Sequence, residues 1–335
     1  MNTLPFAHGG PPLVARLRST PEDFLVEELP VGEADGDGEH VLLEVEKRDA
    51  NTMWVARELA RFAGVKPVAV GFAGLKDRHA VTRQRFSVQL AGRPEPDWTA
   101  FPHPEVRIAS SARHRRKLKR GALAGNRFTL VLRDVRGERE RAEAVLGAMV
   151  AHGVPNYFGA QRFGHGGANV ERARGMFDGK RVDRATRSIL ISAARSKLFN
   201  DVLARRVDEG TWNAALDGDI WCLDGSRSWF GPEPFTPALE KRLADGDIHP
   251  SGPLWGRGDM PTREAARHLE QAAVEADAGL AAGLERVGLE QDRRPLRLLP
   301  RELAWDWLSD DALQLRFCLP PGAYATVVVR ELAVA

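Results

Sequence analysis

Apolar and polar residues alternate along several short stretches of the chain, and this period of two predicts β-strands. In the first half of the chain the alternating segments are residues 13–18, 24–29, 40–47, 83–90 and 128–133. Near the C-terminus, residues 313–319 and 325–332 are also predicted to be strands. Residues 326–329 are nearly all β-branched, which is typical of an interior strand. We therefore expect the last of these segments to pair with the N-terminal sheet.

A helical period replaces the alternation in other parts of the chain. A first helix is predicted to begin at Asn51 or Thr52 and to end near Gly64, because these residue types suit the two ends of a helix. Further helices are predicted over residues 138–152, over residues 183–206, and from an N-cap at Thr262 to about residue 276. The composition changes near residue 152, where we place a domain boundary. The pattern indicates an α+β protein.

The length and composition are those of a globular protein with two domains. The chain has 335 residues, of which 43% are hydrophobic and 28% charged, and these values exclude a disordered or fibrous protein. The formal net charge is only +2, so binding to nucleic acid would depend on a local basic patch. The only cysteines, Cys222 and Cys318, are too few for a disulfide framework or a cysteine-rich zinc site. We expect two buried thiols in a reducing compartment.

No segment predicts export or insertion into a membrane. The N-terminus lacks the charged and apolar regions of a signal peptide, and no uninterrupted apolar run has the length that spanning a bilayer needs. The expected location is the cytoplasm. The sequence leaves the oligomeric state open, with a monomer as the expectation.

The strongest charge feature of the chain is the basic run, residues 113–120. Six of its eight residues are Lys or Arg. Such a run neutralises several phosphates, so a nucleic-acid backbone is the favoured partner and affinity should fall with salt. The alternative is a solvated basic loop without a partner, although the cations would then repel one another. The predicted backbone contacts are Arg113, Arg115, Arg116, Lys117, Lys119 and Arg120.

A second candidate for RNA contact is the aromatic segment, residues 156–164. It combines aromatic side chains with an arginine and two glycines. Aromatic platforms interleaved with arginine are a feature of surfaces that stack on RNA bases. An interdomain hinge that buries its rings explains the same pattern, and both interpretations stay open here.

A carboxylate inside a glycine-hinged turn is the candidate for catalysis. Asp77 lies in residues 71–84, between Gly71 and Gly74 on one side and the alternating segment 83–90 on the other. The segment also contains several cations, namely Lys76, Arg78, His79 and Arg83. A cation within a few Å would hold Asp77 ionised, and an ionised carboxylate can act as nucleophile or base. By itself the pattern also fits a solvated turn with ordinary surface charge.

This turn resembles the signature of the TruD family of tRNA pseudouridine synthases, whose catalytic aspartate follows a Gly-x-x-Gly-x-Lys pattern. Asp77 occupies that position, after Gly71, Gly74 and Lys76. The resemblance extends almost from end to end, and several blocks in one order are more specific than a single motif. The other blocks are residues 21–24, 125–130, 154–164, 192–200 and 326–332.

The resemblance implies a fold, a reaction and a partner. The implied fold is α+β, with a mixed, mainly antiparallel sheet as the catalytic core, formed by residues 1–151 and 300–335. The implied tRNA-contacting insertion is an α+β TRUD domain at residues 152–299. The reaction is the isomerisation of uridine 13, in the D stem of tRNA, to pseudouridine. It needs no cofactor and no metal, in agreement with a sequence that has no dinucleotide fingerprint, Walker loop or metal-ligand spacing.

The resemblance also assigns residues around the base. Phe24 matches a phenylalanine that contacts the substrate base, and Arg18 matches a basic residue near the catalytic carboxylate. Asn126 matches a substrate-binding asparagine and Phe128 a phenylalanine that lines the active site. Tyr324 stands where the family has a phenylalanine that stacks on the target base, and it adds a hydroxyl group. The residues alone leave alternatives, because Phe24 could be core packing and Asn126 could cap a turn.

Two other classes of function compete with this hypothesis. A non-catalytic RNA-binding protein or RNA chaperone would need the basic run and the aromatic segment but not Asp77. A glycoside hydrolase or N-glycosidase would need a second carboxylate paired with Asp77. The candidates for that partner are Glu22, Asp23, Glu27 and Glu28.

Overall fold

The computed structural model describes residues 4–335 and divides the chain into two compact units. The sheet unit comprises Leu13–Gly137, Arg301–Gly322 and Ala335. The helical unit comprises the segment that ends at Pro12, Glu138–Pro300 and Ala323–Val334. The first three residues, which belong to the N-terminal segment expected to lack a signal peptide, lie outside the described residues. The domain ranges expected above, 1–151 with 300–335 and 152–299, stay a prediction.

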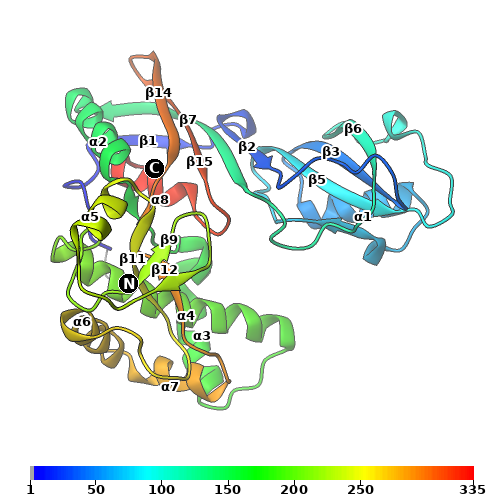
Figure 1. Ribbon diagram of the computed structural model, residues 1–335. Coiled ribbons are helices and arrows are strands. Elements are labelled where there is room, and N and C mark those ends of the chain that lie inside the picture. The colour runs from blue at the N-terminus through cyan, green and yellow to red at the C-terminus, as the bar shows by residue number, and fades with distance from the viewer. Residues whose placement is uncertain (1–3) are drawn as a thin grey trace. The chain divides into compact units, whose positions relative to one another are not determined.

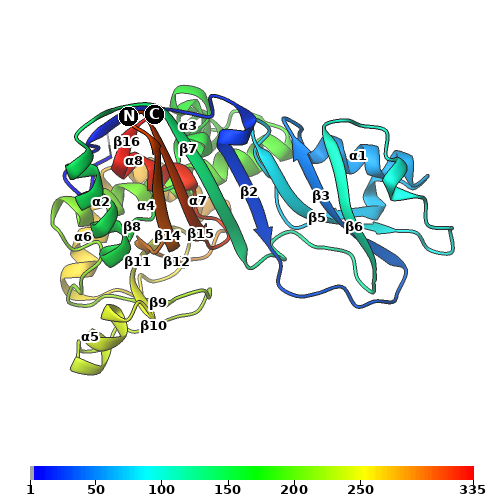
Figure 2. The same ribbon diagram turned by 90° about the horizontal axis from the view of Figure 1, so that it is seen from above.

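The sheet unit is built on a mixed, mainly antiparallel sheet with the strand order β14-β15-β7-β2-β5-β3-β6 (Figure 2). Only β2 and β5 run parallel in this order, and β1 and β4 pair antiparallel with β7 and β5. The strands are β1 (Leu13–Leu17), β2 (Phe24–Leu29), β3 (His40–Arg48), β4 (Val70–Phe72), β5 (Val81–Gln89), β6 (Val106–His114), β7 (Gly125–Gly137), β14 (Arg301–Ser309) and β15 (Ala312–Leu319).

Helix α1 (Thr52–Phe62) lies along one face of β3 and β5 (Figure 1). The Asn51 side chain accepts hydrogen bonds from the amides of Met53 and Trp54, so it caps the helix as its sequence predicts. Val55 and Leu59 of the helix pack against the inward side chains of the two strands. Burying each such side chain contributes about 1.5–3 kcal/mol, so this core holds α1 against the sheet.

The helical unit surrounds the long helix α4 (Arg184–Asp208), which begins after the N-cap Asp183. Its predicted apolar stripe is buried along its length, from Leu190 to Val202. The other helices are α2 (Arg139–His152), α3 (Ala168–Phe177), α5 (Pro237–Ala244), α6 (Glu264–Glu275), α7 (Ala278–Arg286) and α8 (Ala325–Leu332). The strands are β8 (Val154–Pro155), β9 (Trp221–Leu223), β10 (Trp229–Phe230), β11 (Ile248–Leu254), β12 (Asp292–Pro295), β13 (Arg297–Leu298) and β16 (Ala333–Val334).

The prediction of an interior strand over residues 325–332 is wrong, because this segment forms helix α8. Val327, Val328, Glu331 and Leu332 are all buried there. A continuous apolar run carries no period that separates a buried strand from a buried helix, so β-branched residues decided the prediction and tertiary packing overrode them.

One smaller prediction is also wrong, and one strand was not predicted. Helix α6 begins at Glu264 with Arg263 as its N-cap, so Thr262 does not cap it. The buried hydroxyl of Thr262 instead donates to Oε2 of Glu270 at 3.0 Å. Strand β14 was not predicted, since its alternating residues are all partly or fully exposed to solvent and no face is apolar enough to stand out.

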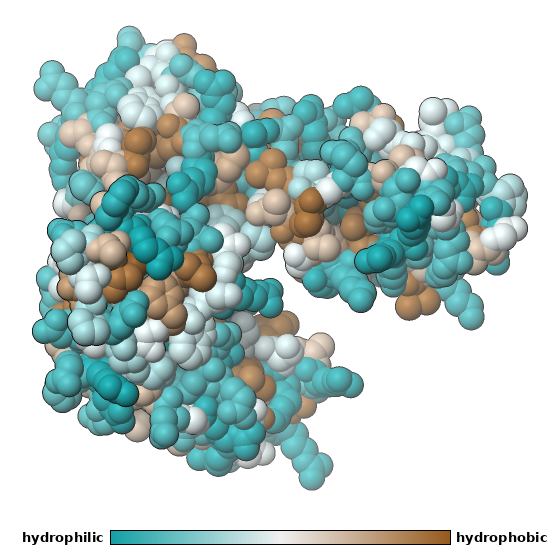
Figure 3. All heavy atoms as spheres, viewed as in Figure 1, coloured by the Kyte–Doolittle hydropathy of each residue, from teal (hydrophilic) through white to brown (hydrophobic). Residues whose placement is uncertain are grey.

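The predicted mixed, mainly antiparallel α+β architecture is confirmed. On the face of the molecule in Figure 3, hydrophobic residues are exposed in small groups among hydrophilic ones, as in ordinary globular proteins. Within residues 4–335, none of the helices combines the length and the apolar character that crossing a lipid bilayer requires.

Candidate active site

Asp77 lies in the loop between β4 and β5. Its side chain is 46% exposed, and its Oδ2 accepts a hydrogen bond from Nη2 of Arg18 at 3.1 Å. The two residues are 59 positions apart in the sequence. Folding therefore gives the carboxylate a positive partner that is not one of the cations next to it in the chain.

Arg18 holds an unusual backbone conformation while it makes this contact. Its φ is +62°, in the left-handed region that residues with a side chain seldom adopt. Its guanidinium carbon lies 4.1 Å from the centre of the Phe24 ring, and its Nε is buried without a hydrogen-bond partner. Strained backbone of this kind is found preferentially at functional sites. The strain places the guanidinium between an aromatic face and the Asp77 carboxylate.

Phe24 is buried at the start of β2. The centres of the Phe24 and Phe128 rings are 6.3 Å apart in an edge-to-face arrangement. The Phe128 ring stacks on the Phe317 ring, with 5.5 Å between the ring centres. Both predicted aromatic residues therefore belong to one buried cluster beneath Arg18. Phe24 is linked to Asp77 through Arg18, and its assignment as a contact to the substrate base stays a prediction.

The Asp77 loop is anchored by a buried ion pair on its other side. Nζ of Lys76 lies 2.8 Å from Oε2 of Glu28, and the two side chains are only 5% and 2% exposed. Glu28 lies near the end of β2, and its Oε1 also accepts from the amide of Arg85. Buried charges need such complete pairing, because an unpaired charge in the interior costs several kcal/mol.

Asn126 stands directly opposite Glu28 in the pairing of β2 with β7. Its Oδ1 is buried, and the structure gives this oxygen no hydrogen-bond partner. Buried polar atoms are nearly always paired, so an unsatisfied acceptor next to the anchor of the Asp77 loop is available to a donor such as a base N–H. The substrate-binding role assigned to Asn126 by resemblance stays a prediction.

Three residues that contact the Asp77 loop were not predicted from the sequence as site residues: Lys47, Thr52 and Gln84. The buried Nζ of Lys47 donates hydrogen bonds to the carbonyl oxygen of Asp77, at 2.8 Å, and to that of Ala50, at 2.7 Å. Burial lowers the pKa of this ammonium to about 8, and the nearby Asp77 charge opposes the effect. Lys47 and Gln84 stand at positions of β3 and β5 where the alternation would place an apolar residue facing the core. A polar residue at such a position is the sequence signal that could have identified them.

Tyr324 belongs to the helical unit, immediately before α8. Its hydroxyl accepts hydrogen bonds from Nε and Nη2 of Arg162, at 2.9 and 2.6 Å. The extra oxygen that distinguishes it from phenylalanine is thus paired. Arg162 belongs to the aromatic segment, where Tyr157 and Phe158 are buried, and this burial favours the packing interpretation of the segment.

The end of the basic run lies next to β4 and the beginning of the Asp77 loop. The amide of Leu118 donates to Oγ of Ser87, and the amide of Gly121 donates to the carbonyl of Ala73, both at 2.8 Å. Gly71 is required there, since a Cβ at this position would lie 2.5 Å from the carbonyl oxygen of Leu118. The end of the run is therefore held next to the Asp77 loop, and its first two residues belong to β6, so the run does not form a free loop.

Carboxylates and carbonyls already engage part of the run. Arg113 pairs with Glu95 at 3.1 Å and Arg115 with Asp37 at 2.6 Å. Lys117 donates to the carbonyl of Val68, and the Arg120 guanidinium lies 4.0 Å above the Phe72 ring. Among the residues that the structure describes, no carboxylate forms an ion pair with Arg116 or Lys119, which are both exposed.

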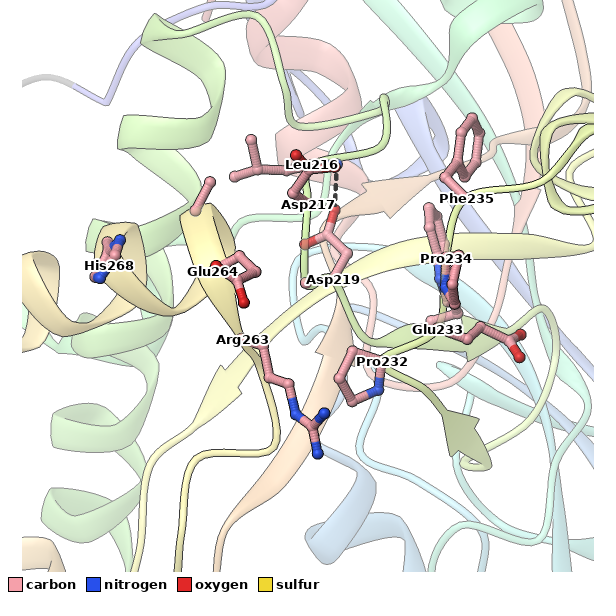
Figure 4. A pocket seen from close by; sticks show the side chains of 13 residues that line it. Leu216, Asp217, Asp219, Pro232, Glu233, Pro234, Phe235, Arg263, Glu264 and His268 are labelled. Carbon is pink, nitrogen blue, oxygen red and sulfur yellow. Dashed lines mark hydrogen bonds between the residues drawn. The ribbon is translucent and has the colours of Figure 1, made fainter.

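A pocket of about 640 Å³ lies elsewhere, within the helical unit (Figure 4). Carboxylates and aromatic rings line it, among them Asp217, Glu233 and Phe235. Both carboxylate oxygens of Asp219 already have partners within the protein. Its Oδ2 accepts a hydrogen bond from the amide of Leu216 at 2.8 Å, and its Oδ1 pairs with Arg206. The predicted site residues are not among those that line this pocket.

Comparison with known proteins decides the family. The model of the family described as tRNA pseudouridine synthase D (TruD) matches residues 1–171 and 178–332. The chain belongs to this family. The predicted family is therefore confirmed, and with it an isomerase of the tRNA pseudouridine synthase class.

Individual relatives agree over nearly the whole chain. The chain is 53% identical to tRNA pseudouridine synthase D of Xanthomonas euvesicatoria and 49% identical to that of Methylococcus capsulatus, with 98% of this chain and 94% of each relative covered. A crystal structure of a putative TruD protein from Methanosarcina mazei superposes with a TM-score of 0.75 at 22% identity. It covers 98% of this chain and 95% of its own, and supports the fold.

Proposed function

We propose that this TruD protein isomerises uridine 13 in the D stem of tRNA to pseudouridine, with Asp77 as the catalytic carboxylate acting on an extruded nucleotide. The observation that supports the proposal most directly is the ion pair between Arg18 and Asp77. The reaction needs one negative carboxylate near C1′ of the ribose, with a positive group to hold it in place. Arg18 meets that need because its guanidinium donates to the carboxylate and lies against the Phe24 ring.

The chemistry breaks the bond from N1 of the uracil to C1′ and forms a new bond from C5 to C1′. Nothing is oxidised or hydrolysed, and the C5 proton is released as another proton is taken up at N1. The Asp77 carboxylate acts either by attacking C1′ or by removing the 2′ proton, and both routes require the half-exposed position that the side chain has. The target base must leave the helical stack first, at a cost of a few kcal/mol.

The basic run is the proposed source of binding energy that offsets this cost. The main chain at its end is hydrogen-bonded to Ser87 of β5 and to Ala73, at the beginning of the loop that carries Asp77. Exposed cations without a protein partner are the ones that gain most from a phosphate, which makes Arg116 and Lys119 the main candidates. Contacts of this kind position the RNA and carry little sequence information.

Replacing Arg116 and Lys119 together by glutamine should weaken tRNA binding and flatten its salt dependence. Each lost phosphate contact reduces the slope of log affinity against log salt by about 0.7–0.9, so the pair should reduce it by roughly 1.5. A filter-binding titration at several salt concentrations measures the slope. The comparison is Arg115→Gln with Asp37→Asn: Arg115 already has a carboxylate partner, so its loss should change the slope less than the loss of an unpaired cation. An unchanged slope in the first variant would exclude both cations from the RNA footprint.

The experiment that tests the function is to map pseudouridine in tRNA treated with the protein. An unmodified tRNA transcript is incubated with the enzyme, treated with carbodiimide and read by primer extension. A single new stop that reports position 13 is the expected result. A stop at another uridine would contradict the position but not the reaction, and the absence of any stop over a range of tRNAs would contradict the reaction.

The geometry disfavours an N-glycosidase, which needs a second carboxylate available beside Asp77. Asp23 and Glu28 are almost fully buried in ion pairs with Arg133 and Lys76, so neither is accessible to a substrate. Glu22 and Glu27 are more exposed, in ion pairs with Arg48 and Arg83.

A further inference from the structure

Three polar side chains lie in the apolar core between the sheet and α1. Lys47, Thr52 and Gln84 are 0%, 1% and 3% exposed. Their neighbours on the inward face of β3 and β5 include Val45 and Phe86, which belong to the apolar core. Burying a polar group costs free energy unless it is hydrogen-bonded, and burying an ammonium costs most. Stability alone would favour apolar residues of similar size at these positions. The three side chains therefore require another explanation.

Their hydrogen bonds converge on the main chain of the Asp77 loop. Nζ of Lys47 binds the carbonyl of Asp77 itself and that of Ala50, just before the N-cap of α1. Oγ1 of Thr52 accepts from the amide of Lys76 at 3.1 Å and donates to Oε1 of Gln84 at 3.1 Å. Nε2 of Gln84 donates to the carbonyl of Gly74 at 3.2 Å. The loop is thus held at residues 74, 76 and 77.

We propose that Lys47, Thr52 and Gln84 form a buried clamp that positions the catalytic carboxylate. The inference rests on the proposed function, and the three are positioning residues, since none of them touches the carboxylate group. Each is fixed by the rigid strand or helix that carries it, so the clamp transfers the position of β3, β5 and α1 to the loop. The Asp77 side chain is then free to meet the ribose while its main chain cannot shift.

The clamp explains why a loop rich in glycine and exposed charge can carry precise chemistry. A displacement of about 1 Å at a reacting group lowers a rate by roughly 100-fold. Arg18 contacts only the end of the Asp77 side chain, through one half-exposed ion pair, and such pairs hold geometry weakly. The main-chain anchors from the core provide the restraint that the exposed pair lacks. Burial also lowers the pKa of Lys47, because removing an ammonium group from water costs free energy.

The test is Lys47→Met, which keeps the length of the side chain and removes its donors. Single-turnover formation of pseudouridine should fall about 100-fold, while KM for tRNA stays within threefold. Amide hydrogen exchange in the peptide that covers residues 73–81 should accelerate at least tenfold, as the loop is released. The matched control is Thr82→Val, since Thr82 is buried directly opposite Lys47 and its hydroxyl has no hydrogen-bond partner. It should leave both readouts unchanged.

Loss of folding is separated from loss of positioning by two further variants. Thr52→Val keeps the shape of the side chain, removes one anchor and should lower the rate roughly 10-fold, and it carries the test if Lys47→Met does not fold. Leu59→Ala weakens the same core without touching the clamp and should leave the rate of the folded enzyme unchanged. A rate within twofold of wild type in Thr52→Val and in folded Lys47→Met, or unchanged exchange in the loop peptide, would overturn the clamp.

The exchange measurement keeps this inference distinct from the proposed function. If the wild-type protein forms no pseudouridine in any tRNA, the proposed function fails whatever the variants do. Faster exchange of the loop peptide in Lys47→Met, with no change in Thr82→Val, would still support the clamp in that case. Normal activity of the wild type together with unchanged exchange and rate in the variants would overturn the clamp alone.

Discussion

Asp77→Asn is expected to abolish pseudouridine formation and to leave tRNA affinity within a few-fold of wild type. The amide has the shape of the carboxylate but can neither attack C1′ nor remove a proton from C2′, so the rate should fall by more than about 1,000-fold. Binding should persist because the proposed phosphate contacts lie on the basic run. Single-turnover kinetics with saturating enzyme, together with a filter-binding titration, measures the two effects separately.

The control for this substitution is Asp49→Asn. Asp49 is similarly exposed, lies close to the same loop and pairs with His79 at 2.8 Å. The Asp49→Asn substitution therefore removes one exposed negative charge from the same region, and this variant should keep nearly normal activity. Because the pair between Arg18 and Asp77 is also half exposed, neither variant should lose more than about 1 kcal/mol of stability. Full activity in Asp77→Asn would defeat the proposed mechanism.

Lys76→Met is expected to destabilise the sheet unit by about 3–5 kcal/mol. The substitution leaves the Glu28 carboxylate buried without a cation, and the cost of an isolated buried charge far exceeds the worth of an exposed ion pair. The double variant Lys76→Met with Glu28→Gln should recover most of the loss, because glutamine is neutral and still accepts from the amide of Arg85. Equilibrium unfolding in urea measures the free energy of unfolding of the wild type, the single variant and the double variant.

An exposed pair supplies the comparison for the buried one. Lys241 and Asp245 lie one turn apart on α5, and their side chains are largely exposed. Lys241→Met should cost less than about 1 kcal/mol. If Lys76→Met proved equally mild, the burial of the Glu28 pair would not have the energetic weight given to it here, and its role in anchoring the Asp77 loop would have to be abandoned.

Much of the fold was accessible from periodicity alone. The alternation over residues 40–47 and the capped helix after Asn51 correspond to β3 and α1, because one face of each element is apolar and the other polar. The run that forms α8 was mistaken for a strand, since nearly all of its residues are buried and the apolar residues leave no period to read. Strand β14 was missed for the opposite reason, as no residue in it is buried.

The candidate site divides in the same way. Asp77 and Arg18 were identified because the motifs around them are local in sequence, and each motif fixes the type of residue at a given spacing. The contacts that hold Asp77 were not accessible, because Lys47 and Gln84 look like ordinary polar residues of a strand until the core encloses them. The partner of Lys76, Glu28, lies 48 positions away, and nothing local marks it out from its neighbours.

For this protein the sequence alone determined the family and the α+β class, and it marked Asp77 as the candidate carboxylate, because those properties are encoded in short blocks of residue types. The tertiary structure decided which side chains contact the main chain of the Asp77 loop and which charges are buried. Those properties depend on contacts between strands that are distant in the chain, and hydrogen bonds and ion pairs act only over the few Å that folding creates.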